Sequence, residues 1–454
     1  ICISNVLRVK MFRFFISFVI ILLSAFAVSA KETNLKSTLE ATYNNNYLIA
    51  QQREKILKFN EIVTQQLSTI KPNVSASLSQ NLEESNGKYN NSASITINQL
   101  LFDGGHSLNS IDAAKYNVYA ERELLIKTEQ DNLLKAIIAY MDLRQAQANL
   151  DLAKNNIKVI EEQLRAAKNR FEVGEVTRTD VSQTEARLAL AVSNVETRKA
   201  VLTGKSATYL LVVGEDHGDL STPPKHPRIP NTFTEAEKIA LENHPRILAA
   251  SLQLKGSEYR VDASQRIFSP TITGSITSKA GSSISSSTGA TIQATIPLFN
   301  SGNLRSKKRA AINDKKISKH ALDIALLTTR SNLQIHHSSW LAAVAAIKAS
   351  KAQIKASQIA FEGMREESKL GSRTTLDVLD AEQELLSARS NLVTALRDEQ
   401  VQAYNVLSEM GQLTTSNLGL EVQTFNSLDN NDKIEQTSPL GKARIRILEK
   451  LKNR

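Results

Sequence analysis

The chain has 454 residues, of which 5% are aromatic and one is Trp, and its formal net charge is +10. The low aromatic content argues against large aromatic cores, and long stretches rich in Ala, Leu, Lys, Glu and Gln favour long helices. The basic residues are not interleaved with aromatic side chains, which argues against a nucleic-acid partner.

The first predicted element is a secretion signal at residues 1–30. Met11 is a better start than the residues before it, and an apolar stretch at 14–28 is too short to span a bilayer comfortably. Small residues at 28–30 suit cleavage, so we expect the mature chain to leave the cytoplasm. The single cysteine, Cys2, precedes this signal, so we expect no disulfide and no lipid-bearing cysteine in the mature chain.

An internal duplication organises the rest of the chain. Residues 102–105 (Phe-Asp-Gly-Gly) match 299–302 (Phe-Asn-Ser-Gly), and Gly174 matches Gly371, with each pair 197 positions apart. Such a constant offset indicates two copies of one unit. We predict a first repeat at 31–214, a Pro-rich linker at 215–232, a second repeat at 233–413 and a polar, basic tail at 414–454.

Each repeat is expected to begin with a helix and to continue with two strands. The first of these helices is expected at about 35–70, and the strands lie within 72–102 and 269–299. Apolar positions alternate with Ser, Thr and Asn along these strands, and the last strand is expected to reach Leu298. Hairpin turns are predicted at 86–87 and 281–282. Strands of about ten residues can cross a bilayer when tilted, and a soluble sheet with one wet face is the alternative.

A long helix and a shorter one complete each repeat. Residues 105–173 contain no Pro or Gly after Gly105, and 303–370 contain only Gly363. At 1.5 Å per residue, such helices are about 100 Å long. Apolar residues spaced three and four apart indicate coiled-coil seams, and the first shorter helix is expected at about 175–213.

Four strands alone cannot form a closed membrane structure. Strands in lipid need every backbone group paired, and the smallest membrane barrels have eight strands. Several subunits must therefore share one barrel, with eight strands in a dimer or twelve in a trimer. The faces that carry Ser, Thr and Asn would then line a wet lumen.

Three segments resemble the TolC outer-membrane efflux family, namely 99–105, 297–302 and 370–380. The resemblance covers nearly the whole mature chain. It implies a mixed α/β membrane protein, a homotrimer whose twelve-stranded β-barrel continues into an α-helical coiled-coil barrel in the periplasm. The strand-to-helix junctions would contain Phe102, Gly104, Gly105, Phe299 and Gly302.

The same resemblance implies a passive exit duct in the outer membrane, extending into the periplasm, for a tripartite efflux pump or a type I secretion system. A periplasmic adaptor protein and an inner-membrane transporter would be its partners, docking at the turns that contain Gly174 and Gly371. We expect no enzymatic activity, no cofactor and no metal. The alternative is a periplasmic coiled-coil adaptor or structural protein of an export machine.

The two helix turns carry the candidate functional residues. Thr177 with Asp180, and Thr374 with Asp377, have the spacing of a capping box, so helix initiation is one interpretation of these aspartates. Asp380 differs, because Gln183 occupies the matching position in the first repeat. In a trimer, Asp377 and Asp380 would give two stacked rings of carboxylates that repel one another.

The resemblance implies that these acids surround a closed periplasmic gate. It further implies that Asp180 and Arg373 take part in the ties that keep this gate shut. Ser368 occupies a position where TolC has a tyrosine, so part of that latch departs from the family.

The histidines are weaker candidates. His336 and His337 are adjacent in a predicted helix, so their side chains point about 100° apart and do not readily share a metal ion. We interpret them as surface residues. His217, His226 and His244 show no metal-ligand spacing.

Overall fold

The computed structural model describes residues 32–83, 88–281 and 284–425. The expected signal at 1–30, the turn at 86–87 and most of the tail at 414–454 lie outside these residues. The chain forms two compact units. The first comprises Ile1–Asn45, Lys135–His226 and Ala343–Val401, and the second comprises Asn46–Leu134, Pro227–Ala342 and Gln402–Arg454. Both units draw on both halves of the sequence, so neither coincides with a single repeat.

The order of elements is the same in the two halves. The first half contains α2 (Leu35–Asn45), α3 (Tyr47–Ser68), β2 (Asn73–Glu83), β3 (Lys88–Phe102), α4 (His106–Glu172) and α5 (Arg178–Val213). The second contains α6 (Phe233–Asn243), α7 (Pro245–Arg266), β5 (Thr271–Gly281), β6 (Ile284–Thr295), α8 (Asn303–Lys369) and α9 (Thr375–Glu409). The strands and the long helices confirm the predicted mixture of strands and long helices and its repetition in the two halves.

The single helix expected at the start of each half is wrong, because each is two helices. Asn46 ends α2 and caps α3, since its side-chain oxygen accepts hydrogen bonds from the backbone N–H groups of Leu48 and Ile49. His244 has the same role before α7, and Pro245 occupies the first turn of that helix, where its missing N–H costs nothing.

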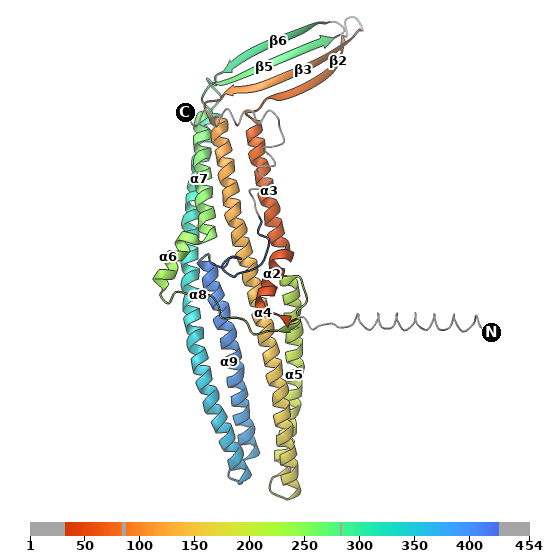
Figure 1. Ribbon diagram of the computed structural model, residues 1–454, viewed down its shortest axis with the longest axis vertical. Helices are drawn as coiled ribbons and strands as arrows, with labels where there is room; N and C mark the ends of the chain where they lie inside the picture. Colours follow the sequence, from red (N-terminus) through yellow and green to blue (C-terminus); the bar gives the residue numbers. More distant parts are fainter. Residues whose placement is uncertain (1–31, 84–87, 282–283, 426–454) are drawn as a thin grey trace, which may run out of the picture. The chain divides into compact units, whose positions relative to one another are not determined.

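The second unit contains a four-stranded antiparallel sheet in the order β2-β3-β5-β6 (Figure 1). Its register puts residues of like polarity opposite each other. Ser77 and Ser94 share a hydroxyl hydrogen bond of 2.8 Å, whereas Ala76 pairs with Ile95 on the other face. The predicted alternation therefore extends across the sheet as one polar face and one apolar face.

The last strand is shorter than expected. β6 ends at Thr295, and Ile296 and Leu298 lie beyond it. Pro297 explains the difference, because it has no N–H to donate to a strand ladder. β5 ends at Gly281 and β6 begins at Ile284, so the predicted turn at 281–282 lies partly outside the described residues.

Helix packing in the second unit combines ring stacking, ion pairing and apolar contact. Tyr116 on α4 stacks on Tyr259 on α7, with ring centroids 5.2 Å apart. Lys55 on α3 pairs with the buried carboxylate of Glu121 on α4 over 3.0 Å. A further cluster packs α7 against α8 through Ile247, Ala250 and Ala325.

The first unit also contains a two-stranded parallel sheet. β1 (Glu32–Thr33) pairs with β4 (Asp219–Leu220), which lies within the predicted linker. The buried Tyr140 on α4 anchors this sheet, because its hydroxyl donates to the backbone oxygen of Ser221 over 2.7 Å. Among the described residues, no helix is long and apolar enough to serve as a membrane span.

Candidate functional site

The α4–α5 and α8–α9 turns have nearly the same backbone. Gly174 and Gly371 each have a φ of +80°, the left-handed conformation that ends a helix. In the first turn the N–H of Glu175 donates to the oxygen of Arg170, and in the second the N–H of Ser372 donates to the oxygen of Glu367. The equivalent backbone hydrogen bond therefore closes each of the two turns.

Both predicted capping boxes are present. Asp180 Oδ2 accepts hydrogen bonds from the backbone N–H of Thr177 over 2.9 Å and from its hydroxyl over 2.8 Å. Asp377 Oδ2 accepts the same pair of bonds from Thr374, each of 2.9 Å. Helix initiation therefore accounts for the hydrogen bonds of both carboxylates. The hydrogen bonds from Thr374 lower the pKa of Asp377, so this group keeps its negative charge in mild acid.

Asp380 makes a different kind of contact, as the lack of an acidic residue at the matching position Gln183 suggested. Arg187 on α5 donates from Nη2 to Asp380 Oδ1 on α9 over 2.9 Å. This ion pair connects the α4–α5 hairpin to the α8–α9 hairpin within the first unit. The sequence did not indicate Arg187, because a basic residue on a predicted helix surface is unremarkable.

The second connection between the turns involves Ser368. Arg170 at the end of α4 donates to the backbone oxygen of Ser368 over 3.2 Å and lies 3.4 Å from its hydroxyl. Ser368, which departs from the family pattern, thus takes part in a contact with Arg170 between the two turns. Only the structure identified Arg170, since nothing in the sequence distinguishes it from its basic neighbours.

Arg373 makes its ion pair inside its own hairpin. Its Nε donates to Glu367 Oε2 over 2.9 Å, and this hydrogen bond raises the pKa of the guanidinium. Asp180 and Arg373 line one hollow of about 480 Å³ between the turns, but in the described chain no ion pair joins them. Within one chain, Arg170 and Arg187 make the connections that we expected from Arg373 and Asp180. A role of the latter two between subunits stays a prediction.

A buried carboxyl group lies on α9 two residues beyond Asp380. Glu382 on α9 has 5% of its surface exposed, and neither carboxyl oxygen has a hydrogen-bond partner among the described residues. It lines a hollow of about 410 Å³ together with Asn156 on α4 and Asn194 on α5. Burial raises the pKa of Glu382 to about 7, so the group is partly protonated at neutral pH.

The strand-to-helix junctions differ between the two halves. Gly104 has a φ of +66°, and a Cβ added there would lie 2.3 Å from the Cβ of Ser269. In the second half, Ser301 takes the matching position with a φ of 53°. Phe102 and Phe299 lie before these turns and are exposed, and both Gly105 and Gly302 also have positive φ. The close approach to Ser269, which follows α7, therefore requires glycine only in the first junction.

The interpretation of His336 and His337 as surface residues is wrong for one of them. His337 is buried, and its Nε2 lies 3.1 Å from the backbone oxygen of Pro230. His244 is also buried, and its Nδ1 accepts the N–H of Arg246 as a helix cap. Burial lowers the pKa of His244 to about 4, so it is neutral at physiological pH. In the part of the chain that the structure describes, no group of three His, Cys, Asp or Glu residues suits a metal ion.

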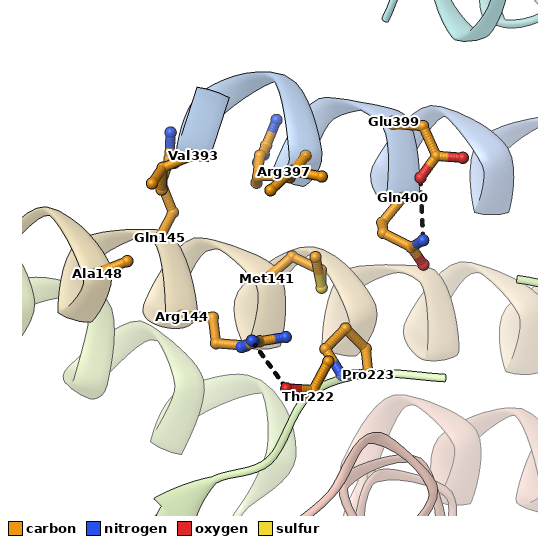
Figure 2. A pocket seen from close by; sticks show the side chains of 11 residues that line it. Met141, Arg144, Gln145, Ala148, Thr222, Pro223, Val393, Arg397, Glu399 and Gln400 are labelled. Carbon is orange, nitrogen blue, oxygen red and sulfur yellow. Dashed lines mark hydrogen bonds between the residues drawn. The ribbon is translucent and has the colours of Figure 1, made fainter. Parts of the chain in front are cut away.

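A further hollow of about 270 Å³ lies in the first unit between α4, α9 and the segment before Lys225 (Figure 2). Its wall is mostly apolar, with Met141 on α4 and Pro223 in the linker. Arg144 closes one side, since its guanidinium donates to the hydroxyl of Thr222 over 3.4 Å. No sequence motif marked this hollow, because its lining comes from three distant segments.

Comparison with known proteins identifies the fold and the family. The family model described as "Outer membrane efflux protein" matches residues 39–208 and 238–411. The chain belongs to this family. The resemblance drawn from 99–105, 297–302 and 370–380 is thereby confirmed, and the location is the outer membrane.

Individual relatives agree with this assignment. The outer membrane efflux protein BepC of Brucella suis is 31% identical over 407 residues, covering 87% of this chain and 89% of its own. The outer membrane protein TolC of Vibrio cholerae is 22% identical, covering 84% of this chain and 92% of its own. The crystal structure of the Campylobacter jejuni CmeC outer membrane channel superposes with a TM-score of 0.76 at 15% identity, covering 89% of this chain and 90% of its own. Such relatives are channel proteins rather than enzymes, and this member of the family serves as an outer-membrane channel for efflux or type I secretion.

Proposed function

We propose that three copies of the chain form one export duct, with a shared twelve-stranded barrel in the outer membrane and a gate at the α4–α5 and α8–α9 turns. The duct is passive. A periplasmic adaptor and an inner-membrane transporter supply the cargo and the energy, and they dock at the turns around Gly174 and Gly371.

The observation that carries this proposal is the open sheet. Its order leaves β2 and β6 as edge strands, each paired on one side only in the described chain. Unpaired strand edges in hydrocarbon leave backbone N–H and C=O groups without partners, at several kcal/mol per group. Three copies that pair β6 of one with β2 of the next would close a ring of twelve strands.

The two faces of the sheet support the same arrangement. The apolar face includes Val74, Leu78 and Ile292, which are 65%, 86% and 76% exposed in the single chain. Lipid would cover these side chains, and the opposite face with its Ser and Thr hydroxyls would border a water-filled lumen.

The gate assignment rests on the turns. Three copies would bring six carboxylates from Asp377 and Asp380 around one axis, where they repel each other and attract cations. Arg187 partly offsets the charge of Asp380, and local hydrogen bonds hold Asp377.

The mass of the purified protein in detergent tests the proposal. We expect a mass of three chains after correction for detergent, and extraction from membranes only with detergent. A monomer, or release by high salt alone, contradicts the shared barrel. Release by salt as a soluble oligomer favours a periplasmic adaptor instead.

A further inference from the structure

The first turns of α8 carry a concentrated basic face. Between Asn303 and His320 the chain contains seven Lys and Arg residues and one acidic residue, Asp314. At 100° per residue, six of the seven fall within an arc of about 120° on the helix surface. These six are Arg305, Lys308, Arg309, Lys315, Lys316 and Lys319.

Acidic side chains do not neutralise this face. Lys315 at its edge pairs with Glu258 on α7 over 3.0 Å. The other five basic residues make no ion pair with any described residue, and four of them are exposed while Lys308 is half-buried. Asp314 lies on the opposite side of the helix, about 180° from Arg305. The face therefore presents uncompensated positive charge.

The position of this face relates it to the membrane strands. β6 ends at Thr295 and α8 begins at Asn303. The link between them exposes Leu298 and Phe299, which are 92% and 88% accessible. Exposed apolar residues next to long basic side chains are typical of the boundary between hydrocarbon and headgroups, where Lys and Arg extend toward the polar layer.

The first repeat shows that the basic face is not needed to begin such a helix. The positions in α4 that match Arg305, Lys308, Arg309 and Lys316 hold Leu108, Ile111, Asp112 and Tyr119. Asp112 is paired with Lys115, so the start of α4 has no comparable excess charge. If the basic residues served only to keep this helix face solvated, we would expect them in both repeats. The basic face occurs only in the second repeat.

We propose that Arg305, Lys308 and Arg309 bind the phosphodiester headgroups of anionic phospholipids in the periplasmic leaflet of the outer membrane. These three residues lie within about 9 Å of the helix start, within reach of headgroups bordering the strands. Lys316 and Lys319 lie about 20 and 24 Å from that start, beyond a Debye length from the same headgroups at physiological salt. The inference rests on the proposed insertion of the strands in the membrane.

Native mass spectrometry of the full-length protein in detergent, titrated with phosphatidylglycerol or phosphatidylcholine, tests the inference. We expect the wild type to retain phosphatidylglycerol at least fivefold more tightly than phosphatidylcholine. The triple variant Arg305→Gln, Lys308→Gln, Arg309→Gln should lose this preference, whereas the distal variant Lys316→Gln, Lys319→Gln should change it less than twofold. Inorganic phosphate should not displace the lipid.

Each alternative outcome overturns the inference. Equal binding of the two lipids by the wild type, or an unchanged preference in the triple variant, shows that this face binds no anionic lipid. Equal losses in the triple and distal variants indicate instead an extended anionic partner along the whole face. Oligomer mass and circular dichroism of each variant establish that it is folded. Flotation of the wild type with liposomes separates the two proposals, because a protein that does not float contradicts the membrane insertion itself.

Discussion

Arg187 on α5 and Asp380 on α9 form the ion pair that joins the two helical hairpins of one chain, with Nη2 and Oδ1 2.9 Å apart. Both side chains are substantially exposed, at 38% and 60%. Exposed pairs of this kind contribute at most about 1 kcal/mol and are weakened by salt. The connection between the two hairpins therefore includes one contact that is easily broken.

Replacing Arg187 with Gln should raise the resting conductance of the channel in planar bilayers, because the hairpin carrying Asp380 loses its connection to α5. The increase should be small at high salt, where the ion pair is already screened. Arg178→Gln, an exposed basic residue near the start of the same helix, is the matched control and should leave conductance unchanged. Equal conductance in wild type and Arg187→Gln at low salt would show that this pair does not hold the gate.

Replacing Asp377 and Asp380 together with Ala should weaken block of the channel by multivalent cations. These carboxylates would supply the negative potential at the mouth, and the lowered pKa of Asp377 keeps that group charged in mild acid. Block should be measured as the cation concentration that halves the current, with Asp151→Ala on α4 as a control for total charge. If the double change left this concentration unaltered, the gate assignment would be wrong even though the family is established.

The stability of the protein should respond to pH through Glu382. Its folded pKa of about 7 lies above the ordinary value of 4.5, so the folded state binds more protons between these values. The free energy of unfolding therefore falls as pH rises from about 4.5 to 7, and it levels off above that range. At about 1.36 kcal/mol per pKa unit, the total loss is at most about 3 kcal/mol. Glu382→Gln should remove this component and raise the melting temperature at pH 8, whereas the exposed Glu384→Gln should not. Identical pH profiles of melting for wild type and Glu382→Gln would contradict the burial of a charged group there.

Two glycines with similar positive φ should differ in their tolerance of a methyl group. Gly411 and Gly371 have φ values of +71° and +80°, but an added Cβ lies 2.4 Å from the Asn243 oxygen at Gly411 and meets nothing within 4 Å at Gly371. Gly371→Ala should cost about 1 kcal/mol of unfolding free energy from backbone strain alone, and Gly411→Ala on the order of 2–4 kcal/mol. Chemical denaturation of the two variants compares them directly, and equal losses would exclude the close contact at Asn243.

Alternation of polar and apolar residues was enough to predict the sheet, because a period of two sustained over about ten residues indicates a β-strand with one apolar face. The turns were equally predictable, since Thr177 with Asp180 and Thr374 with Asp377 form local hydrogen bonds that depend only on nearby sequence. Breaks at Asn46 and His244 were missed although the sequence marks both, since Asn44 and Asn45 precede the first and Pro245 follows the second.

Contacts between distant segments could not be predicted. Arg187 and Asp380 are 193 positions apart, and Arg170 and Ser368 are 198 apart, so only the packing of α4 and α5 against α8 and α9 brings them together. Sequence proximity favoured Arg373 as the partner of the gate acids, whereas the structure pairs it with Glu367 on its own hairpin. The burial of His337 and Glu382 likewise depends on which helix faces meet.

The internal closure of each helix turn has a mechanical consequence. Every hydrogen bond of the two capping boxes, and each backbone bond around Gly174 and Gly371, joins groups of the same turn. A hairpin tip can therefore swing outward as a rigid lever without breaking its own bonds. Contacts between the hairpins would resist that swing, among them those of Arg170 and Arg187 and the packing of Val159 on α4 against the apolar cluster that contains Phe361 on α8. A docking protein that opens the proposed gate would need to compete for these contacts without unwinding a helix.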